Sequence, residues 1–119
     1  MSTRLEFDTS KQGLRAVLKG WEEQALRVFW ENPGGEFSSK DVHVRVNERL
    51  GGGSISRASI INFLERIAST GVLQRREITG KGGYRGIYSQ AMNESEFRAF
   101  IAKTMIDCLM RSFPETKIN

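Results

Sequence analysis

Cysteine, histidine and proline are scarce in this chain of 119 residues, which contains one cysteine, one histidine and two prolines. The lone Cys108 cannot form a disulfide within the chain, and one cysteine with one histidine is too few for a zinc site built from protein ligands. No apolar run approaches the roughly 20 residues that span a bilayer, and the polar start lacks the apolar core of a signal peptide. We therefore expect no metal, no cofactor, no membrane contact and a cytoplasmic location.

Sequence motifs for catalysis are absent as well. The pair Gly80-Lys81 is followed by glycine, where a phosphate-binding loop needs serine or threonine. The sequence has no Gly-x-Ser-x-Gly pattern that would indicate an acyl-transfer nucleophile. His43 is alone on a predicted helix, where a single histidine is usually structural or exposed to solvent. We therefore expect that the protein is not an enzyme.

Positive charge is concentrated in the middle of the chain. Lys and Arg against Asp and Glu number 5 and 5 in residues 1–35, 9 and 5 in residues 36–90, and 4 and 4 in residues 91–119. The net charge of +4 therefore comes entirely from the middle segment. A local excess of positive charge attracts polyanions through counterion release, which makes nucleic acid a candidate partner. A basic, solvated surface without a partner explains the charge alone equally well.

The spacing of apolar residues predicts three helices in the first part of the chain. The expected helices are residues 14–30, in one piece or as two joined near Gly20; a second helix capped by Ser38 or Ser39 and ended by Gly51; and a third helix capped by Ser56 and ended by Gly71. A serine hydroxyl accepts hydrogen bonds from the amides of a first turn, and glycine frequently ends a helix. The third helix has Ile60, Phe63, Leu64 and Ile67 on its inward face.

Two extended stretches follow the third helix. Residues 72–78 and 84–89 flank a glycine-rich turn, a pattern typical of a β-hairpin. Asn93 or Ser95 can cap a final helix, which ends before Pro114. The order helix, helix, helix, hairpin, helix predicts a mainly α fold of the α+β class. We expect a winged helix-turn-helix with a three-helix core, a small β-hairpin wing and a C-terminal dimerisation helix.

Three stretches of sequence carry a resemblance to a known family. They are Trp21-Glu-Glu-Gln-Ala-Leu-Arg-Val-Phe-Trp-Glu, Ser56-Arg-Ala-Ser-Ile-Ile-Asn-Phe-Leu-Glu-Arg-Ile-Ala-Ser-Thr-Gly-Val-Leu and Tyr84-Arg-Gly-Ile-Tyr-Ser. Between Leu18 and Ser89 the chain resembles the penicillinase-repressor family of winged-helix transcriptional regulators, the BlaI/MecI-like proteins.

This resemblance implies a dimeric repressor in which the third helix reads the major groove, the wing contacts the DNA backbone and C-terminal helices join two subunits. The chain departs from the family in its tail, which holds one helix where the family usually has more. The family's regulated cleavage at an Asn-Phe bond also has no counterpart in the tail, because the pair Asn62-Phe63 lies in the third helix. We therefore do not expect induction by proteolysis.

A third helix in the major groove would turn its core face away from DNA. By the 3.6-residue repeat, its outward residues are Ala58, Ile61, Asn62, Glu65 and Arg66. Arg57 suits the N7 and O6 atoms of a guanine, and Asn62 suits an adenine edge. Ile61 either meets a thymine methyl or is half buried at the helix margin.

The glycines beside Lys81 and Arg85 keep the hairpin tip slim enough to approach a phosphate backbone. The predicted DNA contacts are Ser56, Arg57, Ser59, Ile61, Asn62, Arg66, Arg75, Arg76, Lys81 and Arg85.

The final helix carries an apolar stripe with two possible uses. Its predicted dimerisation residues are Phe97, Phe100, Ile101, Met105, Cys108 and Leu109. The stripe could also simply cover the three-helix core. Met92, Ile106 and Met110 add apolar surface outside it, which favours a subunit interface, most often a two-fold one. Cys108 could serve as a redox trigger, but its position on the stripe favours burial.

These patterns predict a homodimeric, sequence-specific DNA-binding transcriptional regulator, a repressor that occupies an operator in double-stranded DNA. The expected domains are a flexible N-terminal arm (1–13), a winged-helix DNA-binding domain (14–90) and a C-terminal dimerisation helix with its tail (91–119). The alternative is a winged helix that serves as a protein-protein interaction module and does not bind DNA directly. The residues indicate no particular inducer.

Overall fold

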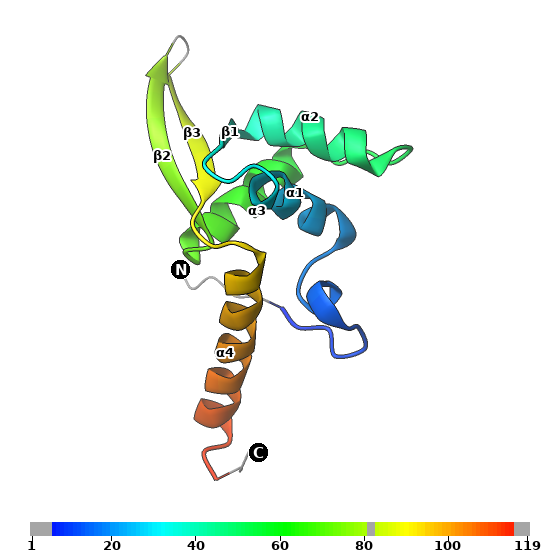
Figure 1. Cartoon of the computed structure of the whole chain (residues 1–119), viewed down its shortest axis with the longest axis vertical. Coiled ribbons are helices and arrows are strands. Elements are labelled where there is room, and N and C mark those ends of the chain that lie inside the picture. Colours follow the sequence, from blue (N-terminus) through cyan, green and yellow to red (C-terminus); the bar gives the residue numbers. More distant parts are fainter. Residues whose placement is uncertain (1–5, 81–82, 116–119) are drawn as a thin grey trace.

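The computed structural model describes residues 6–80 and 83–115, and its elements follow the predicted order with one added strand (Figure 1). In chain order they are the 3-10 helix η1 (Gly13–Ala16), helix α1 (Gly20–Trp30), strand β1 (Glu36–Ser38), helices α2 (Ser39–Leu50) and α3 (Arg57–Ser69), strands β2 (Leu73–Gly80) and β3 (Gly83–Gln90), and helix α4 (Glu94–Ser112).

The first helical region is divided in two. Helix η1 ends at Ala16 and α1 begins at Gly20, which confirms the alternative of two helices. Leu14 of η1 and Leu18, which lies in the break itself, are both buried in the core. At the start of α1 the backbone N–H of Lys19 donates a hydrogen bond to the side chain of Glu22, three residues along the chain, at 2.7 Å. This bond satisfies a first-turn donor that the helix itself leaves unpaired.

Side-chain caps define where the other helices begin. The structure selects Ser38 over Ser39 for α2 and Asn93 over Ser95 for α4, and it confirms Ser56 for α3. The acceptor and donor of each cap are Ser38 Oγ with the amide of Asp41 (3.2 Å), Ser56 Oγ with the amide of Ser59 (3.1 Å), and Asn93 Oδ1 with the amide of Glu96 (2.8 Å). Each cap contributes about 1 kcal/mol to stability.

The three strands form one antiparallel sheet in the order β1, β3, β2. The hairpin strands pair from Leu73 with Gln90 to Gly80 with Gly83. Strand β1 was not predicted, because three residues after a proline-glycine turn are too few to show alternating hydrophobicity. Its Phe37 is nevertheless buried and lies opposite Tyr88 of β3.

The core lies where the helices meet the sheet. All four residues that were predicted to face inward from α3 are buried. Phe97 of α4 is fully buried in the same core. Trp21 and Trp30 are half buried at the margin of the core. The indole Nε1 of Trp30 donates a hydrogen bond to the carbonyl of Met92 at 3.2 Å, which fixes the chain just before α4.

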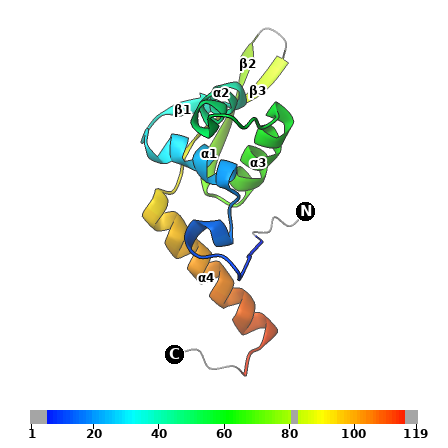
Figure 2. The same ribbon diagram turned by 90° about the vertical axis from the view of Figure 1, so that its right-hand side faces the viewer.

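Helix α4 packs on the domain only through its first turns and then projects away from it (Figures 1 and 2). Phe97 is fully buried, and Phe100 and Ile101 are partly buried against the core. The expectation of a buried Cys108 is wrong, because the helix has left the domain before that turn and Cys108 is exposed. Within the described part of the chain, no helix has the length and apolar character needed to cross a membrane.

Candidate nucleic-acid interface

The outer face of α3 is open to solvent. Burial of four apolar side chains fixes the rotation of the helix, so the residues between them face outward. The residues that were predicted to face outward are all exposed: Ala58, Ile61, Asn62, Glu65 and Arg66. Ile61 is 37% exposed, so it offers an apolar contact on this face. The first turn presents Arg57 and Ser59 on the same open side.

Two side chains of this face are uncommitted. Arg57 and Asn62 make no side-chain hydrogen bond or ion pair with any of the residues in 6–80 and 83–115. The other polar groups at the start of α3 are already used, because Ser56 caps the helix and its hydroxyl also donates to the Ser59 hydroxyl at 3.0 Å. Arg57 and Asn62 are therefore two groups on the open face of α3 with free capacity for a partner.

The link between α2 and α3 is held by side chains that were not identified from the sequence. Asn47 accepts a hydrogen bond from the backbone N–H of Ile55 at 2.7 Å and donates one to its carbonyl at 3.2 Å. A ring nitrogen of His43 lies 2.9 Å from the same carbonyl. Gly51 turns the chain after α2 with a φ of +70°, a conformation that glycine adopts at little cost. Together these residues set the position at which Ser56 begins α3.

The wing is tied to α3 by an ion-pair cluster, so the two elements are adjacent. Arg75 Nε of β2 donates to the carboxylate of Glu65 at 2.8 Å, and Arg75 Nη1 donates to Glu77 at 3.2 Å. The hydroxyl of Tyr88 on β3 donates to the same Glu65 carboxylate. Gly86 makes room for the cluster, because a Cβ at that position would lie 2.9 Å from Arg75 Nε.

Three arginines that were predicted to contact DNA have acidic partners within the chain. Besides Arg75, Arg66 Nη2 donates to the buried carboxylate of Glu22 at 2.8 Å. Arg76 forms two hydrogen bonds with Glu36, at 2.6 and 2.9 Å, and they hold the pKa of that carboxyl below its usual value. These pairs reduce the positive charge that the surface offers to a polyanion.

The remaining cations are distributed around α3. Arg85 of β3 is exposed and has no acidic partner among the described residues, and Lys81 lies outside the described residues. Two further exposed cations on α2, Lys40 and Arg45, have no acidic partner among the described residues and were not predicted from the sequence. Arg45 lies over the ring of Phe37, 4.9 Å from its centre. Both belong to the basic middle segment, residues 36–90, and its excess of positive charge could have identified them.

The predicted dimerisation residues divide into two groups. Phe97 belongs to the domain's own core, and Phe100 and Ile101 pack against it. Met105 is half buried, whereas Cys108 and Leu109 are exposed. The large apolar side chains exposed on the projecting half of the helix and at its C-cap, at spacings of three and four residues, are Ile106, Leu109, Met110 and Phe113.

Solved structures of low sequence identity share this arrangement. A possible transcriptional regulator from Methanosarcina mazei Go1 is 15% identical, with a TM-score of 0.60 over 98% of this chain and 100% of the other. PadR from Bacillus subtilis, solved in complex with operator DNA, is 22% identical, with a TM-score of 0.50 over 85% and 54%. The ferric uptake regulator from Pseudomonas aeruginosa, solved with manganese, is 16% identical, with a TM-score of 0.51 over 63% and 52%. The chain has a winged-helix fold.

This winged-helix chain spans about half the length of the P. aeruginosa and B. subtilis proteins, 52% and 54% respectively. No family model and no curated protein matches the sequence. At these identities the likeness shows the fold alone, in agreement with the winged helix that was predicted from the sequence. The structural neighbours do not single out the penicillinase-repressor family, so that finer assignment stays a prediction.

Proposed function

We propose that this winged helix is a sequence-specific DNA-binding transcriptional regulator, a homodimer that represses by occupying an operator and has no catalytic role. The observation that carries the proposal is the open face of α3, where Arg57 and Asn62 have no partner in the described part of the chain. Arginine and asparagine are the side chains that bond guanine and adenine edges in two places at once. The presence of operator DNA in the B. subtilis PadR structure supports the same use of the fold here.

In this mechanism α3 enters the major groove with its first turn leading. Arg57 and Asn62 select bases, and the exposed Ile61 contacts a thymine methyl. Arg85 on the wing and Lys40 on α2 contact phosphates on either side of the groove, which fixes position without selecting a sequence. Arg66, Arg75 and Arg76 act indirectly, because their ion pairs hold α1, α3 and the sheet in register.

Dimerisation supplies the rest of the specificity. A good bidentate contact discriminates between bases by about 1–3 kcal/mol, so the two on one subunit give only modest selectivity. Two subunits that read two half-sites double the number of contacts. The projecting half of α4 supplies an interface, because its apolar face is too exposed to contribute to the core of its own chain. A two-fold pairing of this face covers it with an identical face from a second copy.

A protein-protein interaction module is the second candidate. It is favoured by the ion pairs of Arg66, Arg75 and Arg76, which neutralise charge that a DNA-binding surface would use. The same open face of α3 would then contact a partner protein.

The deciding experiment is selection of bound duplexes from a random pool, followed by affinity measurements at several salt concentrations. We expect enrichment of a sequence with two related half-sites, centred about one helical turn of DNA apart. The affinity should fall steeply between about 50 and 200 mM salt, because each neutralised phosphate releases counterions. Absence of duplex binding at low salt would reject the regulator and favour the interaction module.

A further inference from the structure

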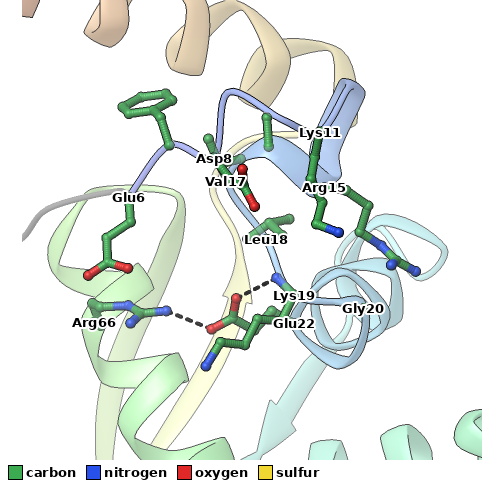
Figure 3. A pocket seen from close by; sticks show the side chains of 12 residues that line it. Glu6, Asp8, Lys11, Arg15, Val17, Leu18, Lys19, Gly20, Glu22 and Arg66 are labelled. Atoms are coloured by element: carbon green, nitrogen blue, oxygen red, sulfur yellow. Dashed lines mark hydrogen bonds and ion pairs between the residues drawn. The ribbon is translucent and has the colours of Figure 1, made fainter.

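A pocket and one face of a helix lie outside the proposed contacts with DNA. The pocket, of about 720 Å³, lies between the N-terminal segment, α1 and α3 (Figure 3). Figure 3 shows acidic and basic side chains mixed around it, so its charges select no class of ligand. The face of α4 that points away from the domain has a regular pattern along its whole length, and this pattern does select a partner.

Helix α4 has apolar residues on two opposite sides. Phe97, Phe100 and Ile101 pack into or against the core of their own domain. On the opposite side, exposed residues without charge follow one another at steps of four, three, four, three and four residues. They are Ser95, Ala99, Ala102, Ile106, Leu109 and the C-cap residue Phe113. Steps of this kind average 3.5 residues, the repeat of a coiled coil, and we call these six residues the outer seam.

The size of the side chains changes along the outer seam. The first three residues, near the domain, are small, and the last three are large. In a parallel pair of helices each residue meets its own copy, so large layers hold the helices apart and small layers leave voids. In an antiparallel pair centred between Ala102 and Ile106, every layer joins one large and one small residue. The facing pairs are Ile106 with Ala102, Leu109 with Ala99, and Phe113 with Ser95. Only the antiparallel pair keeps one helix separation along the seam.

The charges beside the outer seam favour the same orientation. A parallel pair brings opposite flanks of the two helices together, which places Arg98 of each copy beside Lys103 of the other, two contacts between like charges. An antiparallel pair brings the same flanks together, so Arg98 lies beside Ser112 of the second copy. The one contact between like charges then joins the two copies of Lys103. The Lys103 ammonium lies 3.2 Å from the carboxylate of Asp107 in its own chain, which offsets this charge.

We propose that two copies of this chain pair through the whole outer seam of α4, as an antiparallel coiled coil in which the large residues of each helix cover the small residues of the other. The inference rests on the homodimer of the proposed function, but on no contact with DNA, and it adds the orientation and register of the helices. A two-fold axis requires the same surface on both copies, and here it passes between Ala102 and Ile106. Residues 95–113 span about 27 Å at a rise of 1.5 Å per residue, so the end of each α4 reaches the first turn of the other.

An exchange of side-chain size between two facing positions tests the register. The Kd of self-association of the full chain is measured by sedimentation equilibrium. Leu109→Ala uncovers Ala99 of the second copy and should weaken association about tenfold or more. Ala99→Leu places two large residues in one layer and should also weaken it about tenfold, whereas in a parallel pair it fills a void and strengthens association. The double variant again has one large and one small residue in that layer, so its Kd should return to within about threefold of the wild type.

The matched control combines Ala99→Leu with Ile106→Ala, which exchanges similar volumes between positions that do not face each other. Its association should be weaker than that of either single variant. Ala99, Ile106 and Leu109 are all exposed in the subunit, so none of these substitutions should unfold it. Urea unfolding of each variant checks this expectation.

A disulfide tests the orientation independently. Cys108→Ser removes the native thiol, and Lys103→Cys in that background places two thiols together across the two-fold axis, so mild oxidation should produce a covalent dimer. Leu109→Cys in the same background is the comparison. In a parallel pair its two copies are neighbours, but in the antiparallel pair they lie ten residues apart along the helix, about 15 Å, which no disulfide can span.

Three results would overturn the antiparallel pairing. They are a wild type that stays monomeric at every concentration, a double variant that associates no better than its single variants, and cross-linking of Leu109→Cys in place of Lys103→Cys. The first result also removes the homodimer from the proposed function. The other two reject the orientation and register but keep the homodimer. Failure to bind any duplex overturns the proposed regulator and leaves the paired helices intact.

Discussion

The guanidinium of Arg75, on strand β2 of the wing, lies 2.8 Å from the carboxylate of Glu65, on the outer side of α3. The same carboxylate accepts a hydrogen bond from Tyr88 of β3, and Gly86 leaves the space that the guanidinium occupies. Side chains from both strands of the wing therefore converge on one residue of the helix. This cluster sets the angle between wing and helix, on which simultaneous contact with a groove and its phosphates depends.

A double-mutant cycle measures the coupling between Glu65 and Arg75 in this cluster. Glu65→Ala, Arg75→Ala and the double variant are compared by their free energies of unfolding in urea. We expect a coupling of about 0.5–1 kcal/mol, a modest value because both side chains are partly exposed to screening solvent. The control cycle uses Lys103 and Asp107, a more exposed pair on α4 that should couple less. A coupling no larger than the control would show that the wing is positioned by the backbone alone.

The cluster of Glu65, Arg75 and Tyr88 also predicts how stability depends on pH. Burial and the neighbouring Glu65 raise the pKa of Tyr88 from 10.0 to about 12, although Arg75 opposes them. Above about pH 10 the unfolded tyrosine loses its proton while the folded one keeps it, so the unfolded state binds fewer protons and stability falls up to about pH 12. Urea unfolding on either side of pH 10 should reveal this slope. Tyr88→Phe should remove part of it, and an unchanged slope in that variant would contradict the raised pKa.

Local patterns predicted the elements of the fold well, because helix caps and buried stripes depend on residues close together in the sequence. Ser56 and the inward face of α3 are examples, and both are confirmed. The ion pairs could not be predicted in this way. Arg66 and Glu22 are 44 residues apart, and Arg76 and Glu36 are 40 apart, so only the packed fold brings them together.

Periodicity also does not tell how far a domain extends along a helix. The predicted dimerisation stripe on α4 groups Phe97 with Cys108, whereas Phe97 lies in the core of its own chain and Cys108 is exposed, where no part of the domain remains to cover it. The sequence pointed to Ile106, Leu109 and Met110 as interface residues, and the structure adds Phe113 to this exposed apolar face. That Arg57 has no ion-pair partner among the described residues is likewise a property of the whole fold, because it depends on which side chains the packing brings near it.

The hydrogen bonds between Asn47 and the backbone of Ile55 hold the link between α2 and α3. They predict that stability depends on a residue away from the DNA face. Asn47→Ala removes both hydrogen bonds to the backbone of Ile55 and should lower the free energy of unfolding by about 1–3 kcal/mol. Glu48→Ala, at the next position on the same helix, is exposed and should change it little. Measurement by urea unfolding separates the two. Equal small losses would show that the turn is held by its own backbone and that Asn47 does not position α3.

Two arginines near the interface should differ in the kind of DNA affinity that they support. Arg57→Ala should weaken binding to the selected operator by about 1–3 kcal/mol and leave random duplex nearly unaffected, because its partner is a base. Arg85→Ala should weaken both duplexes alike, because its partner is a phosphate. Fluorescence anisotropy with the two duplexes at one salt concentration makes the comparison. Equal losses for Arg57→Ala on both duplexes would remove it from base reading.

The exposed end of α4 decides whether two copies bind together. Leu109→Glu places a charge in the centre of the apolar face, where pairing would bury it, so the variant should be monomeric in analytical ultracentrifugation. The substitution should not destabilise the fold of the subunit itself, because Leu109 lies outside the core. Lys103→Glu is the control on the same helix; Lys103 is already polar and exposed, and its replacement should leave the dimer intact. A monomeric wild type, or a dimer that survives Leu109→Glu, would rule out this face as the interface.

Operator affinity should fall in Leu109→Glu to that of a single half-site, because one subunit offers only the contacts of one α3 and one wing.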